Sequence, residues 1–124
     1  MSGKRKVLLV DDDPAVTSYL VVKLSKLYEV VSTNNPRAAV ALASAEQPHV
    51  ILCDIDMPGM SGGDVAAALA DEPMTALIPV IYLTALVSPQ EASDLDGQVG
   101  GRPGVSKRAQ LSELVEVIDK VTRR

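Results

Sequence analysis

Three carboxylates stand at the ends of two strongly apolar runs of the chain. Asp11 and Asp12 follow the run VLLV at residues 7–10, and Asp54 ends the segment VILCD at residues 50–54. Two like charges about 4 Å apart repel by roughly 1 kcal/mol in water and by about 4 kcal/mol at a partly buried site. A cation is therefore expected beside these acids. Such hard oxygen ligands suit Mg²⁺, which binds one or two carboxylates together with phosphate oxygens.

A hydroxyl and an ammonium group stand at comparable places in two further segments. Thr84 ends the run VIYLT, and Lys107 follows the short segment GVS. With a metal ion present, one of the carboxylates could act as a nucleophile toward a phosphoryl group. Thr84 and Lys107 could then bind the transferred oxygens. The pattern predicts phosphoryl chemistry if the fold brings these side chains into one shallow pocket.

Strand-like and helix-like segments alternate along the chain and must position these side chains. The apolar runs predict strands at residues 6–10, 28–32, 50–54, 80–84 and 104–106. Helical spacing and turn residues predict helices at residues 14–27, 36–45, 63–70, 88–99 and 110–122. The first helix is expected to begin with Asp13 as its N-cap and to bury a stripe that comprises Val16, Leu20, Leu24 and Leu27.

This alternation predicts an α/β protein with a five-stranded parallel sheet and helices on both of its faces. Strands that are apolar on both faces, such as VLLV, are typical of parallel sheets. Ligands in such sheets bind at the carboxyl ends of the strands, which share one edge. The sequence therefore predicts one site at that edge, built from Asp11, Asp12, Asp54, Thr84 and Lys107.

Length and composition narrow the class of protein. The 124 residues suit one domain that occupies the whole chain, and 47% apolar residues argue against a disordered chain. A net charge of −4 without a basic stripe argues against direct binding to nucleic acid, and the apolar runs are too short to cross a membrane. The single Cys53 cannot form an internal disulfide, so a cytoplasmic location is the expectation.

Four motifs in this order resemble those of the receiver domain of bacterial two-component response regulators. They are VDD at 10–12, DIDMPGMSG at 54–62, PVIYLTA at 79–85, and Lys107. The resemblance covers nearly the whole chain and implies a flavodoxin-like sheet with the strand order 2-1-3-4-5. It also implies a phosphorylation-controlled switch that receives its phosphoryl group from a sensor histidine kinase or a phosphotransfer protein.

The resemblance implies a role for each acidic residue of the site. Asp54 is the implied phosphoacceptor. Asp11 and Asp12, together with Asp54, are implied side-chain ligands of Mg²⁺. Asp56 is an implied ligand through its backbone carbonyl.

Three further residues are implied contacts of the phosphoryl group. Thr84 would contact it through its hydroxyl, Ala85 through its backbone N–H, and Lys107 through an ion pair. The output partner is expected to bind the surface between Ser88 and Arg124. A dimer that forms on phosphorylation is one form that this output could take.

The chain departs from the family pattern around the fifth predicted strand. Arg108 stands where the family usually has proline. The cis peptide bond that the family has before this proline is therefore in doubt between Lys107 and Arg108. Gly104 stands where the family usually has an aromatic residue, and the run GQVGGRPG around it is rich in glycine. Since glycine in a regular element costs roughly 0.5–1 kcal/mol, we expect residues 88–104 to open readily and to become ordered on phosphorylation.

The sequence leaves two other functions open. DID at residues 54–56 also resembles the nucleophile motif of aspartate-based phosphatases of the haloacid dehalogenase type, although the acidic pair comes first in this chain. A degenerate receiver that serves only as an interaction module is the second alternative. The favoured interpretation is a switch whose only chemistry is its own phosphotransfer and autodephosphorylation. The sequence does not identify the cognate kinase or the output pathway.

Overall fold

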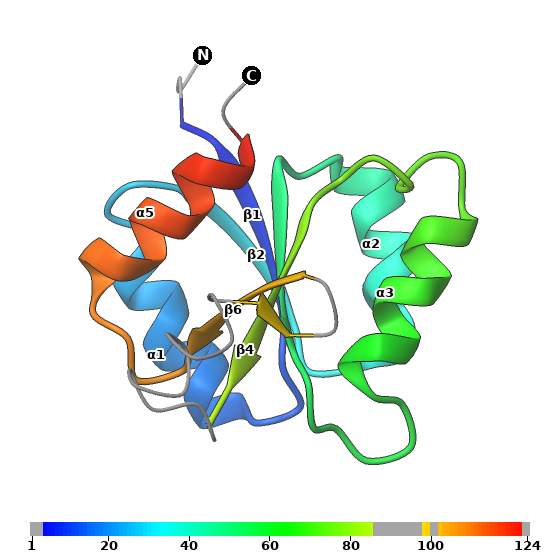
Figure 1. Cartoon of the computed structure of the whole chain (residues 1–124), viewed down its shortest axis with the longest axis horizontal. Coiled ribbons are helices and arrows are strands. Elements are labelled where there is room, and N and C mark those ends of the chain that lie inside the picture. Colours follow the sequence, from blue (N-terminus) through cyan, green and yellow to red (C-terminus); the bar gives the residue numbers. More distant parts are fainter. Residues whose placement is uncertain (1–3, 86–97, 100–101, 123–124) are drawn as a thin grey trace.

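The computed structural model describes residues 4–85, 98–99 and 102–122 (Figure 1). Its sheet has the order β2-β1-β3-β4-β6-β5. Its parallel strands are β1 (Lys6–Val10), β2 (Glu29–Thr33), β3 (Val50–Asp54), β4 (Val80–Thr84) and β6 (Arg102–Ser106). The predicted order 2-1-3-4-5 is therefore confirmed, with β6 as the fifth parallel strand. The two-residue strand β5 (Gln98–Val99) adds to β6 in the antiparallel direction.

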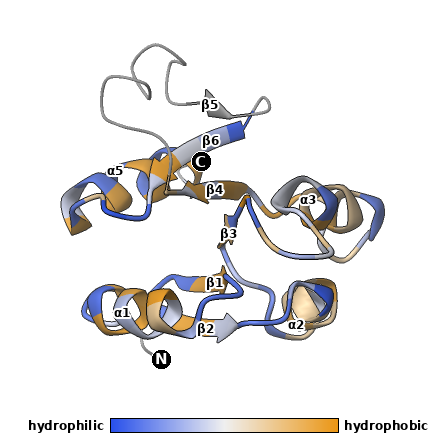
Figure 2. Ribbon diagram, turned by 90° about the horizontal axis from the view of Figure 1, so that it is seen from below, coloured by the Kyte–Doolittle hydropathy of each residue, from blue (hydrophilic) through white to orange (hydrophobic). Residues whose placement is uncertain are grey.

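The helices cover both faces of this sheet. Figures 1 and 2 show α1 (Pro14–Leu24) and α5 (Leu111–Thr122) on one face. The opposite face carries α2 (Ala39–Glu46) and α3 (Gly62–Asp71). This layering confirms the predicted parallel sheet with helices on both faces.

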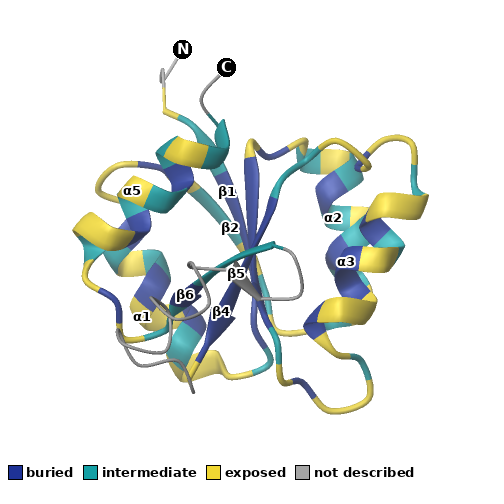
Figure 3. Cartoon of the chain, in the orientation of Figure 1, coloured by how far each residue is buried: buried dark blue, intermediate teal, exposed yellow. Residues whose placement is uncertain are grey.

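The central strands are buried on both sides because consecutive residues face different helices (Figure 3). In β1, Val7 and Leu9 pack with Leu20 of α1 and Ile118 of α5. Leu8 and its neighbours on the other face pack with α2 and α3. Continuous apolar runs are thus required here. An alternating pattern would leave one face of the sheet polar, and the helix pair on that face would have no apolar surface to pack against.

The first helix ends three residues earlier than predicted. It stops at Leu24, with Ser25 as its C-cap, and the chain then turns through hydrogen bonds from Leu27 and Tyr28 to the Leu24 carbonyl. This turn leaves Leu27 49% exposed and buries Tyr28 in the α1 side of the core. Leu27 therefore does not belong to the buried stripe, and Val16 lies only at its margin.

The other predicted boundaries shift by one or a few residues. The second strand begins and ends one residue later than predicted, and α3 is one residue longer at each end. The predicted helix at 36–45 is divided into a 3₁₀ turn (Pro36–Ala38), with Asn35 as its side-chain cap, and the α-helix α2. The last helix begins at Leu111 rather than at residue 110.

The predictions between β4 and β6 have a mixed outcome. Residues 98–99 were predicted to end a helix, but they form β5, since they pair with Arg102 and Pro103. The fifth parallel strand extends from Arg102 rather than from Gly104. The rest of the predicted helix at 88–99, and with it most of the segment expected to become ordered on phosphorylation, lies outside the described residues. No helix in the described ranges has the length and apolar character that a membrane crossing requires.

Candidate functional site

The predicted carboxylates meet at the carboxyl edge of the sheet. Asp11 follows β1, and Asp54 is the last residue of β3, next to β1. One carboxylate oxygen from each of Asp11, Asp12 and Asp54 lies within 4.8 Å of the others. Asp11 and Asp54 are buried, at 0% and 3% exposure, and Asp12 is partly exposed. Asp12 is therefore the most accessible of the three carboxylates.

Lys107 supplies a cation to the same cluster. Its backbone N–H donates to the Thr84 carbonyl at 2.9 Å, which places the residue beside the end of β4. Its Nζ lies 3.0 Å from Oδ1 of Asp54 and 3.1 Å from Oδ2 of Asp11. One ammonium thus contacts two of the three carboxylates, and the four side chains together carry two uncompensated negative charges when all are ionised.

Burial and charge shift the ionisation of this group. Burial raises the pKa of the Asp54 carboxyl, and the Asp11 charge adds to this, while hydrogen bonds from Lys107 and the Asp56 backbone oppose it. Burial alone would lower the pKa of Lys107, but its contacts with Asp54 and Asp11 outweigh burial and raise it. Burial, reinforced by Asp54 and Asp11, raises the pKa of the Cys53 thiol to about 12, so Cys53 is no competing nucleophile at neutral pH.

The three remaining predicted residues lie at the same edge. Thr84 is buried at the end of β4, and Ala85 is exposed directly after it. Asp56 lies two residues beyond β3 with an exposed side chain, which is outside the carboxylate cluster. The structure therefore brings all of the predicted positions to one edge of the sheet, and only the backbone of Asp56 approaches the acids.

Asn34 supports the site and was not predicted to do so. Its Nδ2 donates to the Asp11 carbonyl at 2.8 Å and to the Thr17 hydroxyl at 3.0 Å. Asp11 Oδ1 accepts from the backbone N–H of Asp13, which completes a fixed turn after β1. The sequence shows Asn34 only as part of a turn before Pro36, so its contact with Asp11 could not be read from the pattern.

Gly62 is a second supporting residue that sequence reasoning missed. It is the first residue of α3, and its N–H donates to the Ile55 carbonyl at 2.8 Å. A Cβ at this position would lie 2.5 Å from the Asp54 carbonyl oxygen and 2.9 Å from Cα of Ile55. Glycine is therefore required because the helix start lies directly against the backbone of Asp54.

We expect Asn34→Ala to lower the free energy of unfolding by about 1–3 kcal/mol, because the Asp11 carbonyl and the Thr17 hydroxyl each lose a donor. Urea denaturation measures this. Asn35→Ala is the matched control, since Asn35 caps only the exposed 3₁₀ turn. Asn34→Ala should also weaken the stabilisation by Mg²⁺, whereas Asn35→Ala should not. Equal effects on Mg²⁺ binding would show that Asn34 does not support Asp11.

The cluster fits a divalent cation. Oδ2 of Asp11 is buried and accepts no hydrogen bond from the described residues, although the Lys107 ammonium lies near it. A buried carboxylate oxygen in this state has unused capacity for a positive ligand. Carboxylate oxygens are the ligands that Mg²⁺ prefers, and the partly exposed Asp12 leaves room for its waters.

Comparison with known proteins places this site in a family. The family model described as the response regulator receiver domain matches the sequence over residues 7–119. The chain belongs to the response regulator receiver family. Members of this family are typically signalling switches rather than enzymes, and they bind Mg²⁺ at their acidic pocket. The match does not favour the haloacid dehalogenase or the degenerate-module interpretation.

Individual relatives agree with this assignment. Protein PilH of Pseudomonas aeruginosa is 34% identical over 118 residues, which are 94% of this receiver and 96% of PilH. Response regulator PleD of Caulobacter vibrioides is 42% identical over 82 residues, which are 65% of this receiver and only 18% of PleD. The solved structure of Vibrio cholerae chemotaxis protein CheY4 has a TM-score of 0.79 at 27% identity and covers 96% of this receiver and 99% of that chain.

One departure from the family pattern can be followed in the structure. The described residues contain no cis peptide bond, so the bond between Lys107 and Arg108 is trans. The chain passes from β6 into a turn in which the N–H groups of Arg108 and Ala109 both donate to Ser106. Arg108 is exposed in this turn.

Proposed function

We propose that this receiver domain accepts a phosphoryl group on Asp54 and changes its binding to a partner as a result. The observation that supports this most strongly is that the buried Asp54 lies in one cluster with the Asp11 and Asp12 carboxylates and 3.0 Å from the Lys107 ammonium. A carboxylate oxygen of Asp54 would attack the phosphorus of the donor, and the bond between phosphorus and the donor's leaving atom would break. The phosphodonor would be a sensor histidine kinase or a phosphotransfer protein.

In this proposal each neighbour of Asp54 has a separate task. Asp11, Asp12 and Asp54 would hold Mg²⁺ through their side chains, and Asp56 would contribute its backbone carbonyl. The bound ion would neutralise the acids and bind a phosphoryl oxygen. Lys107, already 3.0 Å from Asp54, would follow the new phosphoryl oxygens. Thr84 would contact them through its hydroxyl, and Ala85 through its backbone N–H.

The chemistry would be limited to this receiver's own phosphotransfer and autodephosphorylation, in the cytoplasm. The output partner would bind the surface between Ser88 and Arg124, without direct contact with nucleic acid or membrane. A shift of Lys107 would be transmitted directly to this surface. Its backbone N–H donates a hydrogen bond to the Thr84 carbonyl at the end of β4, and the chain after it continues into α5.

The proposal is tested by treating the protein with acetyl phosphate in the presence and absence of Mg²⁺. Intact-mass analysis should show the addition of a single phosphoryl group, and labelling should depend on Mg²⁺. No labelling of the wild-type protein in the presence of Mg²⁺ would contradict the proposed function.

We further expect Mg²⁺ alone to stabilise the protein. At a concentration about 100 times Kd, binding to the folded state should add about 2.7 kcal/mol to the free energy of unfolding. Asp12→Ala should remove most of this gain, because the cluster then loses one of its three carboxylate ligands. Asp13→Ser is the matched control: it removes a neighbouring charge but keeps an N-cap for α1. If Asp13→Ser abolished the Mg²⁺ response and Asp12→Ala did not, the site would be misplaced.

A further inference from the structure

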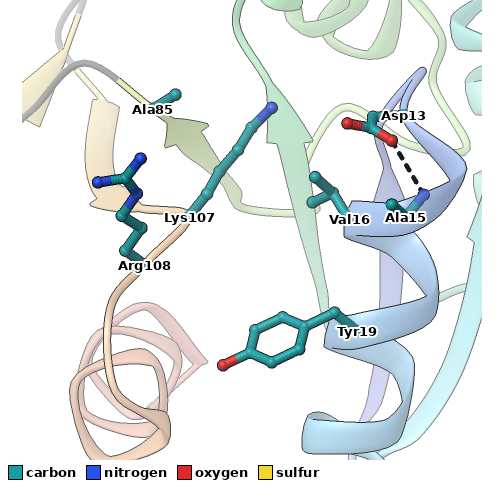
Figure 4. A pocket seen from close by; sticks show the side chains of 7 residues that line it. All are labelled: Asp13, Ala15, Val16, Tyr19, Ala85, Lys107 and Arg108. Atoms are coloured by element: carbon teal, nitrogen blue, oxygen red, sulfur yellow. Dashed lines mark hydrogen bonds between the residues drawn. The ribbon is translucent and has the colours of Figure 1, made fainter.

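A pocket of about 500 Å³ opens beside the phosphoryl site. Figure 4 shows that α1 forms one wall, and that Ala85, Lys107 and Arg108 form the other. Val16 and the ring of Tyr19 give most of the α1 wall an apolar surface, and Asp13, whose carboxylate accepts from the Ala15 N–H, lies at the start of this wall. The volume is in the range of small-molecule sites.

The two cations of the pocket point in different directions. The Lys107 side chain extends to Asp11 and Asp54, which occupy its ammonium group. The guanidinium of Arg108 lies on the side of Ala85 in Figure 4. Arg108 is exposed and forms no ion pair with a residue in the described part of the chain. Its charge is thus available to an anion that enters the pocket.

The backbone that carries Arg108 is held in place. The Arg108 N–H donates to the Ser106 hydroxyl at 3.1 Å. Nζ of Lys23 donates to the Ala109 carbonyl at 3.2 Å and to the Tyr19 hydroxyl at 2.8 Å. Lys23 therefore fixes both the turn that bears Arg108 and the aromatic wall opposite to it. The turn thus presents from a fixed backbone a guanidinium whose planar set of donors matches a carboxylate.

We propose that this pocket receives the leaving group of an acyl phosphate donor, and that Arg108 stabilises the carboxylate released there. The inference rests on the proposed phosphorylation of Asp54. An Asp54 oxygen forms a bond to phosphorus, and the bond between phosphorus and the acyl oxygen breaks. The electron pair of that bond remains on the departing carboxylate as negative charge, and no proton is needed. Val16 and Tyr19 contact the apolar part of the acyl group.

The chemistry of the leaving group makes this proposal specific. Attacking and leaving atoms lie roughly in line across the phosphorus, so the leaving group departs on the side opposite to the attacking Asp54 oxygen. Ala85 and Lys107, the proposed contacts of the phosphoryl group, also line the pocket, so the pocket adjoins that group. Acetyl phosphate releases an anion, which a cation stabilises as it forms. Phosphoramidate releases neutral ammonia from a nitrogen that is already protonated. Arg108 should therefore favour the first donor over the second.

The test compares initial rates of labelling with the two donors by intact-mass analysis at saturating Mg²⁺. Arg108→Ala should lower the rate with acetyl phosphate about fivefold at low ionic strength and the rate with phosphoramidate less than twofold. Arg108→Lys should restore most of the loss, and high salt should reduce the difference between wild type and Arg108→Ala. Lys26→Ala is the matched control, since Lys26 is an exposed cation beyond the C-terminal end of α1.

The outcomes separate this inference from the proposed function. Equal losses with both donors, or no loss with acetyl phosphate, would overturn the role of Arg108 while Asp54 remained the phosphoacceptor. Failure of the wild-type protein to label with either donor would overturn the proposed function, and this inference with it. Urea denaturation of Arg108→Ala should match wild type, because the exposed side chain has no described ion pair to lose.

Discussion

Asp54→Asn is expected to abolish labelling by acetyl phosphate completely. An amide oxygen carries no full negative charge and is a far weaker nucleophile than the Asp54 carboxylate. The neighbouring Cys53 should not take over, because its thiol is protonated at neutral pH. Intact-mass analysis of wild type and variant, side by side, gives the answer. Full labelling of the variant would exclude Asp54 as the phosphoacceptor.

The same variant should be no less stable than wild type at pH 7 without Mg²⁺. The folded-state pKa of Asp54 is raised, mainly by burial, so folding favours its protonated form. At a pH above that pKa, keeping Asp54 ionised therefore costs stability, and this cost disappears as the pH falls below the unfolded-state pKa. Asparagine removes the cost at all pH values. Added Mg²⁺ should reverse the order, because it stabilises wild type more than the variant.

Gly62→Ala is expected to destabilise the protein by about 3 kcal/mol. The added Cβ would lie 2.5 Å from the Asp54 carbonyl oxygen, and both of its nearest neighbours are backbone atoms that cannot rotate away. Either the start of α3 or the end of β3 must move, so the variant should also bind Mg²⁺ more weakly. Urea denaturation and a Mg²⁺ titration followed by amide shifts measure the two effects.

The adjacent glycine provides the control for this variant. A Cβ on Gly63 would meet only the Ser61 hydroxyl, at an ordinary contact distance of 3.6 Å. Gly63→Ala should therefore be neutral or slightly stabilising, because alanine favours a helix more than glycine. Similar losses from the two substitutions would show that contact with Asp54 is not the reason for glycine at position 62.

The convergence of the acids could be predicted from the sequence because it follows from topology alone. A parallel sheet brings every carboxyl strand end to one edge, so locating the ends of the runs before Asp11 and after Val50 was sufficient. The supporting residues could not be predicted in this way. Asn34 bonds to a backbone carbonyl, which every residue has, and only the distance to Asp54 distinguishes Gly62 from Gly63.

The boundary errors have a similar origin. Leu27 and Tyr28 both suit the apolar stripe, and the turn after Leu24 decides which one is buried. Residues 98–99 form a strand only because Arg102 and Pro103 lie opposite, and a pairing of two residues leaves no periodic signal. Local pattern thus predicts the long elements, whereas the short ones depend on partners elsewhere in the chain.

The antiparallel strand β5 also affects how copies of this chain can meet. An unpaired edge strand is a template on which another molecule can add a strand and extend the sheet between copies. Here β5 occupies the outer side of β6, and Pro103 of β6 has no backbone N–H to offer an incoming strand. Intermolecular sheet growth from β6 would first have to remove β5. The β6 edge of this receiver should therefore be protected from fibrillar aggregation.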